Sequence, residues 1–583
     1  MPAPLAYSVH VPDPNSHLFH VTLLLKDAPS VVRLNFPRWT PGSYLLREHG
    51  RHVEGLQATR AGGNVTATKV SPHQWELRSD ANGDLTVSYR VYAHELTVRT
   101  AHLDNTHGFF NGVSLFMVPE GAEARRCTLS IHPPAGWKVA TTLPSTSENQ
   151  FEAEDFHHLV DCPVEMGTHR TLSFSVRGIP HELVLWNRGN EDEQKLVADL
   201  PKLVEQNAQV FGGLPYQRYL FITHLTDSGR GGLEHRDSTA LLYPRFAFRP
   251  EKEYESFLTL VTHEHFHLWN VKRIKPKAFS PYDYTRENPT RLLWAMEGFT
   301  SYYDNLNTRR AGLMTADRYL TVLGELSTQL NQTPGRKAHS LEESSLDAWV
   351  KYYRQDEHTV NSTISYYLKG ELVALCLDLL LRKESSGKKS LDDVMRLLWK
   401  WTQDRGEGLE EGEVEAAAAE VAGRSLKSFF DLTVRSREEL PLAEHLASVG
   451  LEYLTRAPEG ADDKGGTPGK GNGASRPFFG AAIKRDGTVQ NVHPGGPAAT
   501  AGVGPGDQLV ALGGWRVADG NFMARLEEMK PGEAKEVHFF RRDELRTATV
   551  TLAPAPQTCA YLKRRENAPA EQVELRKAWM GAE

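Results

Sequence analysis

Apolar and polar positions alternate through most of the first third of the chain, from its start to about residue 180. In residues 85–91, Leu, Val, Tyr and Val alternate with Thr, Ser and Arg, and a period of two is typical of a half-buried strand. The dipeptide Asn82-Gly83 just before this run favours a tight turn. We therefore predict an antiparallel β domain over residues 1–180, in which His157 and His158 are exposed strand residues.

The spacing of apolar residues changes to three and four positions between about residues 190 and 450. One long pattern of this kind begins near Glu253, and residues 201–210 have the same amphipathic character. Tyr219–Thr223 is instead typical of a short buried strand. These patterns predict a mainly helical domain with a small strand component (α+β) over residues 181–456.

Residues 457–475 are rich in Gly, Pro and charge and cannot bury a core, so we interpret them as a flexible linker. Strand and turn chemistry resumes after this linker and predicts a small β-rich domain over residues 476–556. Residues 557–583 form a C-terminal tail of mixed charge, with a helical tendency near Glu571–Trp579.

The composition excludes several classes of protein. The chain has 583 residues, of which 40% are hydrophobic and 24% charged, so collagen, coiled coil and wholesale disorder are excluded. The chain has 67 Lys and Arg and 74 Asp and Glu, which give a net charge of 67 − 74 = −7. It lacks the basic excess or basic stripe that is typical of a nucleic-acid-binding protein. No apolar run approaches the ~20 residues of a membrane span, and no signal peptide is recognisable. The 4 cysteines are far apart, so we expect a cytoplasmic protein without disulfides.

The most informative segment is an H-E-x-x-H pattern made by His263, Glu264 and His267. Four helical residues turn through about 400°, so both imidazoles project from one face and can reach one zinc ion at ~2.0–2.1 Å. Glu264 then lies beside the metal, where its carboxylate can take a proton from water. His265 falls on the opposite face, and we assign it to packing or to contacts that support the ligands.

A catalytic zinc needs a third protein ligand and one open position. The apolar helical segment Leu292–Tyr303 carries a single carboxylate, Glu297. A carboxylate in such surroundings is rarely buried unless it is paired or bound to a metal. We therefore predict that Glu297 completes a site for one Zn²⁺ per chain, with a solvent-facing glutamate as the alternative.

Several motifs together resemble a known family. H-E-x-x-H followed on a later helix by Glu-Gly-Phe-Thr resembles the gluzincin metallopeptidases, which implies a thermolysin-like catalytic domain. The segment 231–235, Gly-Gly-Leu-Glu-His, resembles the exopeptidase motif that gluzincin aminopeptidases place on an edge strand, and 366–370 resembles their Tyr-x-Lys-Gly segment. With Trp-Thr-Pro-Gly-Ser-Tyr at 39–44, the set is most similar to the glycyl aminopeptidase family, whose members carry a C-terminal PDZ domain.

The resemblance implies catalytic roles at matching positions. The zinc ligands would be His263, His267 and Glu297. Glu264 would be the general base that activates water and returns the proton to the leaving amine. Tyr367 would hydrogen-bond the oxyanion of the tetrahedral intermediate. The adjacent Tyr366 is the weaker candidate, and core packing is the alternative for Tyr367.

The resemblance also implies how substrate would be held. Glu234 would bind the free α-ammonium of a peptide by a charge-assisted hydrogen bond. Gly231 and Gly232 would let the substrate backbone approach closely, with a plain turn as the alternative. The implied partners are peptides with a free amino terminus, and the family tends to prefer small amino-terminal residues such as Gly and Ala.

The C-terminal β-rich domain resembles a PDZ domain. Residues 494–499 and 504–510 match the helix-then-turn signature of bacterial PDZ domains. The implied carboxylate-binding loop, in which backbone N–H groups bind a C-terminal peptide, consists of Phe478, Phe479, Gly480 and Ala481. The alternative is a packing domain without a ligand.

The leading hypothesis is therefore a zinc aminopeptidase, and two alternatives remain open. One is a zinc endopeptidase that recruits substrates through its PDZ domain. The other is a PDZ peptide-binding adaptor with an inactive structural zinc site, although a purely structural site would not need Glu264 beside the metal.

Overall fold

The computed structural model describes residues 2–61, 63–460, 462–471 and 476–582. The chain forms two compact units. The first contains Met1–Pro289, Tyr303–Leu313 and Met395–Glu410, and the second contains Thr290–Tyr302, Met314–Val394 and Glu411–Glu583.

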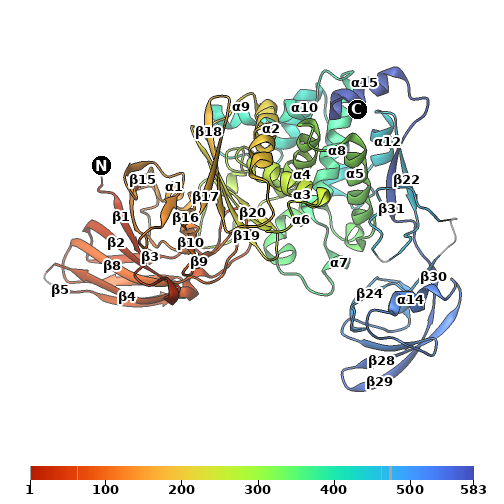
Figure 1. Cartoon of the computed structure of the whole chain (residues 1–583), viewed down its shortest axis with the longest axis horizontal. Helices are drawn as coiled ribbons and strands as arrows, with labels where there is room; N and C mark the ends of the chain where they lie inside the picture. The colour runs from red at the N-terminus through yellow and green to blue at the C-terminus, as the bar shows by residue number, and fades with distance from the viewer. Residues whose placement is uncertain (1, 62, 461, 472–475, 583) are drawn as a thin grey trace. The chain divides into compact units, whose positions relative to one another are not determined.

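The first unit begins with the sheets of an N-terminal β domain (Figure 1). The largest has eight strands in the order β14 (Ser145–Ser147), β15 (Gln150–Ala153), β12 (Cys127–His132), β1 (Leu5–His10), β2 (Leu18–Ala28), β8 (Gly83–Tyr92), β4 (Val53–Arg60) and β5 (Gly63–Asn64). A second has the order β13 (Lys138–Ala140), β16 (Val164–Gly167), β10 (His107–Phe110) and β9 (Ala101–Leu103). A third has the order β11 (Val118–Pro119), β3 (Val31–Asn35), β7 (Gln74–Arg78) and β6 (Thr66–Ser71).

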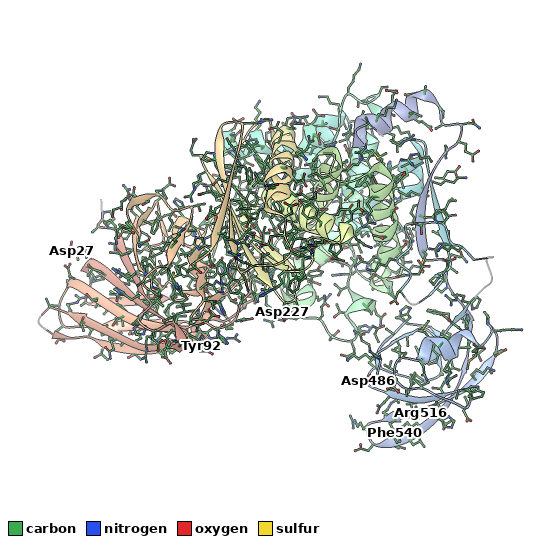
Figure 2. All side chains as sticks on the ribbon, viewed as in Figure 1. Asp27, Tyr92, Asp227, Asp486, Arg516 and Phe540 are labelled. Atoms are coloured by element: carbon green, nitrogen blue, oxygen red, sulfur yellow. The ribbon has the colours of Figure 1, made fainter. Side chains whose placement is uncertain are left out.

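Strand β8 confirms the alternating pattern found in the sequence. Its apolar side chains Leu85, Val87, Tyr89 and Val91 are at most 2% exposed and belong to the core of the domain. Tyr92, which ends the strand and is labelled in Figure 2, is 43% exposed. Neighbouring strands of the eight-stranded sheet are antiparallel, except β1 and β12, which are parallel.

The expectation for His157 and His158 is wrong. Both lie on the short helix α1 (Phe156–Val160) and are half-buried rather than exposed on a strand. The helix begins there because the Asp155 carboxylate accepts a hydrogen bond from the His158 backbone N–H at 2.7 Å, an N-cap that satisfies a free helix donor.

A five-stranded sheet positions the catalytic motifs. Its order is β17 (Arg170–Val176), β18 (Ile179–Trp186), β19 (Tyr219–Thr226), β21 (Ser238–Pro244) and β20 (Gly231–Glu234). The hairpin β17–β18 crosses residue 180, where we expected the domain boundary, and pairs with this sheet rather than with the N-terminal sheets. Helices α2 (Glu193–Phe211) and α3 (Glu251–Phe266) contact each other and the sheet (Figure 1).

The second unit contains most of the helices. They are α5 (Ala316–Asn331), α6 (Leu341–Leu346), α7 (Thr359–Ser362), α8 (Tyr366–Glu384), α10 (Glu413–Ala422), α11 (Lys427–Phe430) and α12 (Leu442–Ala447). Two further helices, α4 (Leu293–Arg310) and α9 (Leu391–Arg405), run from the second unit into the first. Helix α8 is buried along most of its length, so it forms the centre of the helical core.

The C-terminal tail belongs to the helical body rather than trailing from it. Strand β22 (Leu451–Arg456) pairs with β31 (Cys559–Arg564). Helix α15 (Ala570–Met580) then places Trp579 in the core, where its indole Nε1–H donates to the Tyr302 hydroxyl at 2.8 Å. The helical tendency of the tail therefore reflects a packed helix.

The predicted linker is partly anchored to the same body. Asp463 accepts hydrogen bonds from the Arg456 guanidinium, and the Gly466 backbone N–H donates to the Ala560 carbonyl at 2.8 Å. The predicted linker also includes residue 461 and residues 472–475, which lie outside the described residues.

Between β22 and β31 the chain folds into a PDZ domain with its own apolar core. Its elements are β23 (Pro477–Phe478), β24 (Ala481–Ile483), β25 (Val489–Val492), α13 (Pro497–Thr500), β26 (Gln508–Leu512), β27 (Trp515–Arg516), α14 (Phe522–Glu527), β28 (Ala534–Arg541), β29 (Glu544–Thr551) and β30 (Ala553–Pro554). Arg516 and Phe540, labelled in Figure 2, lie on its four-stranded sheet β27-β26-β28-β29. Across the described part of the chain, none of the helices has the length and apolar character needed to span a membrane.

Candidate metal centre and substrate site

The two histidines of the H-E-x-x-H pattern face each other at the end of α3. Their Nε2 atoms are 3.0 Å apart. His263 Nδ1 lies 2.9 Å from an Asp304 carboxylate oxygen, and His267 Nδ1 lies 2.7 Å from the Asn270 carbonyl oxygen. These acceptors hold the proton on each Nδ1 and leave the Nε2 lone pairs directed at the same point. Two ligands of a tetrahedral zinc lie ~3.3 Å apart, so the pair fits a zinc ion.

Glu297 joins this pair. The ligand atoms of His263, His267 and Glu297 all lie within 4.8 Å of one another. Glu297 is 1% exposed, so the solvent-facing alternative is wrong. Two imidazole nitrogens and one carboxylate are a donor set typical of catalytic zinc, and burial of the carboxylate is offset when a cation binds.

Asp304, which orients His263, was missed in the sequence. It lies seven residues after Glu297 on α4, and seven helical residues turn through about 700°, so both carboxylates occupy one face of that helix. A second carboxylate two turns beyond a predicted ligand was the available signal. Metal-binding histidines commonly donate their other ring N–H to a carboxylate of this kind.

Glu264 packs against the edge of the five-stranded sheet. A Cβ at Gly232 of β20 would lie 2.0 Å from a Glu264 carboxylate oxygen, so only glycine leaves room for the carboxylate. Gly231 and Gly232 pair with β21, so the plain-turn alternative is wrong. Because β20 is the outermost strand of its sheet, its other edge can pair with an extended peptide backbone.

Glu234 ends the same strand as a buried carboxylate. It is 4% exposed, and its Oε1 has no hydrogen-bond partner among the residues that the structure describes. The ligand atoms of Glu234, Glu264 and His267 lie within 4.8 Å of one another. Burying a carboxylate that lacks a hydrogen-bond partner lowers the stability of the folded protein, and a bound cation would remove much of that free-energy cost.

The Trp-Thr-Pro-Gly-Ser-Tyr segment covers Glu234, a role that the sequence did not reveal. Gly42 has φ +90°, and a Cβ there would lie 2.5 Å from both carboxylate oxygens of Glu234. Two buried aromatic residues fix this segment. The Trp39 indole N–H donates to the Asp283 carbonyl at 2.8 Å, and the Tyr44 ring stacks on Phe279 with centroids 5.8 Å apart.

His265 packs away from His263 and His267, as predicted. It is fully buried, and its Nε2 lies 2.9 Å from the Tyr216 hydroxyl, which in turn lies 2.8 Å from His181. Asn207 contacts its other ring nitrogen at 3.1 Å. Burial lowers the pKa of His265 well below its usual range, so the ring is neutral and links α3 to the sheet and to α2.

Tyr367 and Glu297 are brought together by two glycines. A Cβ at Gly298 would lie 2.5 Å from the Gly370 backbone, so α4 and α8 cross in close contact there. Tyr367 is half-buried, whereas Tyr366 is fully buried in the core, which favours Tyr367 as the group that substrate can reach. Burial and the nearby Glu297 carboxylate raise the pKa of Tyr367 well above its usual value, so its hydroxyl stays protonated.

Comparisons with known proteins agree with this geometry. Residues 6–168 match the Peptidase M61 N-terminal domain, residues 256–373 match the M61 glycyl aminopeptidase and residues 476–552 match a PDZ domain. The crystal structure of an aminopeptidase N family protein from Idiomarina loihiensis is 36% identical and has a TM-score of 0.92, with 99% of this chain and 100% of that chain covered. This chain belongs to the M61 glycyl aminopeptidase family.

Two other comparisons add little. An M1 zinc metallopeptidase mutant from Deinococcus radiodurans, bound to a Tyr-Ser-Ala substrate, is 13% identical with a TM-score of 0.47 over 75% of this chain and 95% of that chain. No curated protein matches the sequence.

Membership of the M61 family makes the chain a metallopeptidase of the aminopeptidase class and confirms the three-part fold of β domain, thermolysin-like catalytic domain and PDZ domain.

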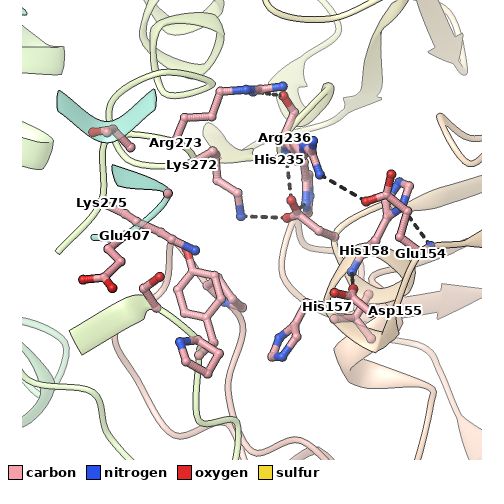
Figure 3. A pocket seen from close by; sticks show the side chains of 18 of the residues that line it. Glu154, Asp155, His157, His158, His235, Arg236, Lys272, Arg273, Lys275 and Glu407 are labelled. Atoms are coloured by element: carbon pink, nitrogen blue, oxygen red, sulfur yellow. Dashed lines mark hydrogen bonds and ion pairs between the residues drawn. The ribbon is translucent and has the colours of Figure 1, made fainter. Parts of the chain in front are cut away.

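A pocket of about 800 Å³ lies beside the strand end that carries Glu234 in this M61 chain (Figure 3). Within it, the Asp161 carboxylate binds the Lys272 ammonium at 2.7 Å and the His235 ring at 3.2 Å. Because His235 directly follows Glu234, this ion pair fixes the end of β20. The pocket lining includes none of the H-E-x-x-H residues, so we do not place the reaction there.

The expected carboxylate loop of the PDZ domain is held by its own backbone. The Phe479 carbonyl accepts from the Ala498 N–H, and the Gly480 carbonyl accepts from the His493 N–H, each at 2.9 Å. Phe479 points into the PDZ core, 2% exposed. Phe478 and Ala481 belong to the strands on either side of the loop, β23 and β24. Binding of a peptide carboxylate by this loop stays a prediction.

Proposed function

We propose that this chain is a zinc-dependent aminopeptidase that removes small residues, Gly or Ala, from peptides with a free amino terminus. The observation that carries the proposal is the position of Glu234. This buried carboxylate, whose Oε1 has no hydrogen-bond partner among the described residues, lies within 4.8 Å of Glu264 and His267 ligand atoms.

That short separation favours an exopeptidase. In a peptide, the α-amino nitrogen and the first carbonyl carbon are joined through one Cα by bonds of ~1.5 Å each. A group that binds the ammonium must therefore lie within a few ångströms of the groups that act on the first peptide bond. Glu234 meets this requirement, and its charge suits an ammonium ion.

The roles of the remaining residues follow from their positions. His263, His267 and Glu297 would hold the zinc. When bound, the zinc would polarise the scissile carbonyl and lower the pKa of water. Glu264 would accept the proton of the attacking water and later donate it to the leaving amine. The protonated Tyr367 hydroxyl would donate a hydrogen bond to the oxyanion.

A preference for Gly or Ala is supported by the segment that covers Glu234. Gly42 lies against both carboxylate oxygens and is fixed by the buried Trp39 and Tyr44. A substrate ammonium bound to Glu234 brings its own Cα next to this segment. Because the segment is anchored by buried aromatic rings, it cannot easily move to admit a large side chain.

The test compares free and blocked peptides. We expect the wild type to hydrolyse Gly- and Ala-initiated peptides and to leave their N-acetylated forms intact. Glu234→Gln should lower kcat/KM for the free peptides about 10²-fold, because one charge-assisted bond is lost. Glu205→Gln, a change of a half-buried carboxylate on α2 that pairs with Arg177, serves as the control and should have wild-type activity. Equal hydrolysis of both peptide forms would instead favour the endopeptidase alternative.

A further inference from the structure

A second cluster of metal-binding side chains lies in the N-terminal domain, apart from the catalytic motif. The hairpin formed by β9 and β10 carries His102, Asp104 and His107, spaced as H-x-D-x-x-H across its turn. One ligand atom from each of the three lies within 4.8 Å of the others. No role in peptide hydrolysis accounts for this cluster.

Both imidazoles are held in the orientation that suits a metal ligand. His102 Nδ1 lies 3.2 Å from the His94 carbonyl oxygen, and His107 Nδ1 lies 3.0 Å from a Glu165 carboxylate oxygen. These acceptors keep the proton on Nδ1 and leave a lone pair on each Nε2. Both Nε2 atoms are buried and form no hydrogen bond among the residues that the structure describes, although an Asp104 carboxylate oxygen lies 3.4 Å from that of His102.

The cost of this arrangement points to a missing partner. A buried polar atom without a partner costs about 1–3 kcal/mol. Within the described part of the chain His107 Nε2 is such an atom, and the polar group beside His102 Nε2 is the Asp104 carboxylate at 3.4 Å. A cation between the rings would satisfy both nitrogens.

Asp104 supplies a negative charge and access from solvent. Its Oδ1 accepts hydrogen bonds from the Thr106 N–H at 2.7 Å and from the Thr106 hydroxyl at 2.6 Å. Its Oδ2 lies 3.4 Å from His102 Nε2. The side chain is 29% exposed, so a hydrated ion can reach it.

Glu165 belongs to the support of this cluster rather than to its ligands. Its two oxygens bind His107 Nδ1 at 3.0 Å and His224 Nε2 at 2.9 Å. His224 lies on β19 of the catalytic sheet, whereas Glu165 lies on β16 of the N-terminal domain. Since both carboxylate oxygens are engaged, Glu165 orients His107 from behind and joins the hairpin to the catalytic sheet.

We propose that His102, Asp104 and His107 bind a second divalent transition-metal ion of the zinc class, through both Nε2 atoms and an Asp104 oxygen, with water at the remaining position. Two imidazoles and one carboxylate suit zinc, and each histidine has an acceptor behind it. The ion would stabilise the hairpin at the junction of β10, β16 and β19. This proposal is independent of the proposed peptidase activity.

The test measures metal content in the full-length protein. After equilibration with Zn²⁺ and desalting, we expect about two zinc ions per wild-type chain by elemental analysis. The double variant His102→Gln/Asp104→Asn should retain about one. The matched control His94→Gln, which changes an exposed neighbouring histidine but keeps its carbonyl, should retain about two. A double variant that binds as much zinc as the wild type would overturn the proposal.

A second measurement separates this site from the catalytic one. In a His263→Gln/His267→Gln background we expect about one zinc per chain and a zinc-dependent rise in Tm, since ligand binding stabilises the folded state. Adding Asp104→Asn should abolish both, while the far-UV circular dichroism stays unchanged. A background protein that binds no zinc, or a rise in Tm that survives Asp104→Asn, would contradict the second site.

Discussion

Glycines serve different physical purposes in the catalytic region and in the PDZ domain. In the catalytic region, Gly232 makes room for the Glu264 carboxylate, and Gly298 and Gly370 let two helices touch. In the PDZ domain, Gly480 adopts φ +78°, a conformation that side chains disfavour. At these three catalytic-region glycines close contact alone excludes a side chain, whereas at Gly480 the backbone conformation already disfavours one and close contacts with Gly496 and Pro497 add to this. The same substitution, Gly to Ala, should fail for different reasons in the two regions.

Among the substitutions in the catalytic region, we expect Glu264→Gln to lower activity the most. The amide fits the same space but cannot accept the proton of water, so kcat should fall about 10²–10⁴-fold. Zinc content should remain at the wild-type value, because Glu264 is not a ligand in the proposed site. Steady-state kinetics with an Ala-initiated peptide and elemental analysis would check both points. Substantial hydrolysis by this variant would remove Glu264 from the role of base.

Gly232→Ala tests whether close contact at the carboxylate matters. The new Cβ would lie 2.0 Å from a Glu264 oxygen, so the carboxylate must move, and kcat should fall about 10²-fold. Gly213→Ala, outside the proposed site, is the control, because its Cβ would meet nothing within 4 Å. Similar activities for the two variants would show that the contact does not position Glu264.

Gly370→Ala tests the helix crossing. A Cβ there would lie 2.5 Å from the Trp294 carbonyl oxygen and 3.0 Å from Gly298 Cα, and backbone atoms cannot turn aside. We expect the free energy of unfolding to fall by about 1–3 kcal/mol, measured by chemical denaturation. Gly213→Ala, which would meet nothing within 4 Å, should not destabilise the protein in this way.

Gly480→Ala should have the smallest effect on the whole protein. The positive φ would cost the PDZ domain about 1–2 kcal/mol, while hydrolysis of short peptides stays at the wild-type rate. Differential scanning calorimetry and kinetics would separate the two effects. A fall in kcat comparable to that of Gly232→Ala would break the distinction between the two regions.

The sequence predicted what has a local signal. The H-E-x-x-H spacing places His263 and His267 on one helical face, and the lone carboxylate of an apolar helix indicated Glu297. Strand β8 was evident from its alternation. In each case the structure depends on residues that are close in the sequence or on a motif whose residue types and spacing are fixed.

Contacts between distant segments had no such signal. Gly42 lies against Glu234, which is 192 positions later in the numbering, and nothing in either segment indicates the pairing. The tail strand β31 has few features that distinguish it from an exposed segment until it pairs with β22. His102 and His107 had no such signal either, because the acceptors behind them, the His94 carbonyl and the Glu165 carboxylate, lie outside the hairpin.

The pairing of β22 with β31 has a consequence for how this protein can be re-engineered. Arg456 and Cys559 are partners in that ladder, so the chain leaves the catalytic body and returns to it at neighbouring points. The PDZ domain is thus an insertion with adjacent ends, the arrangement that most readily accepts exchange for another module. A binding domain of different specificity could replace the PDZ domain, provided that strand β31 and helix α15 are kept.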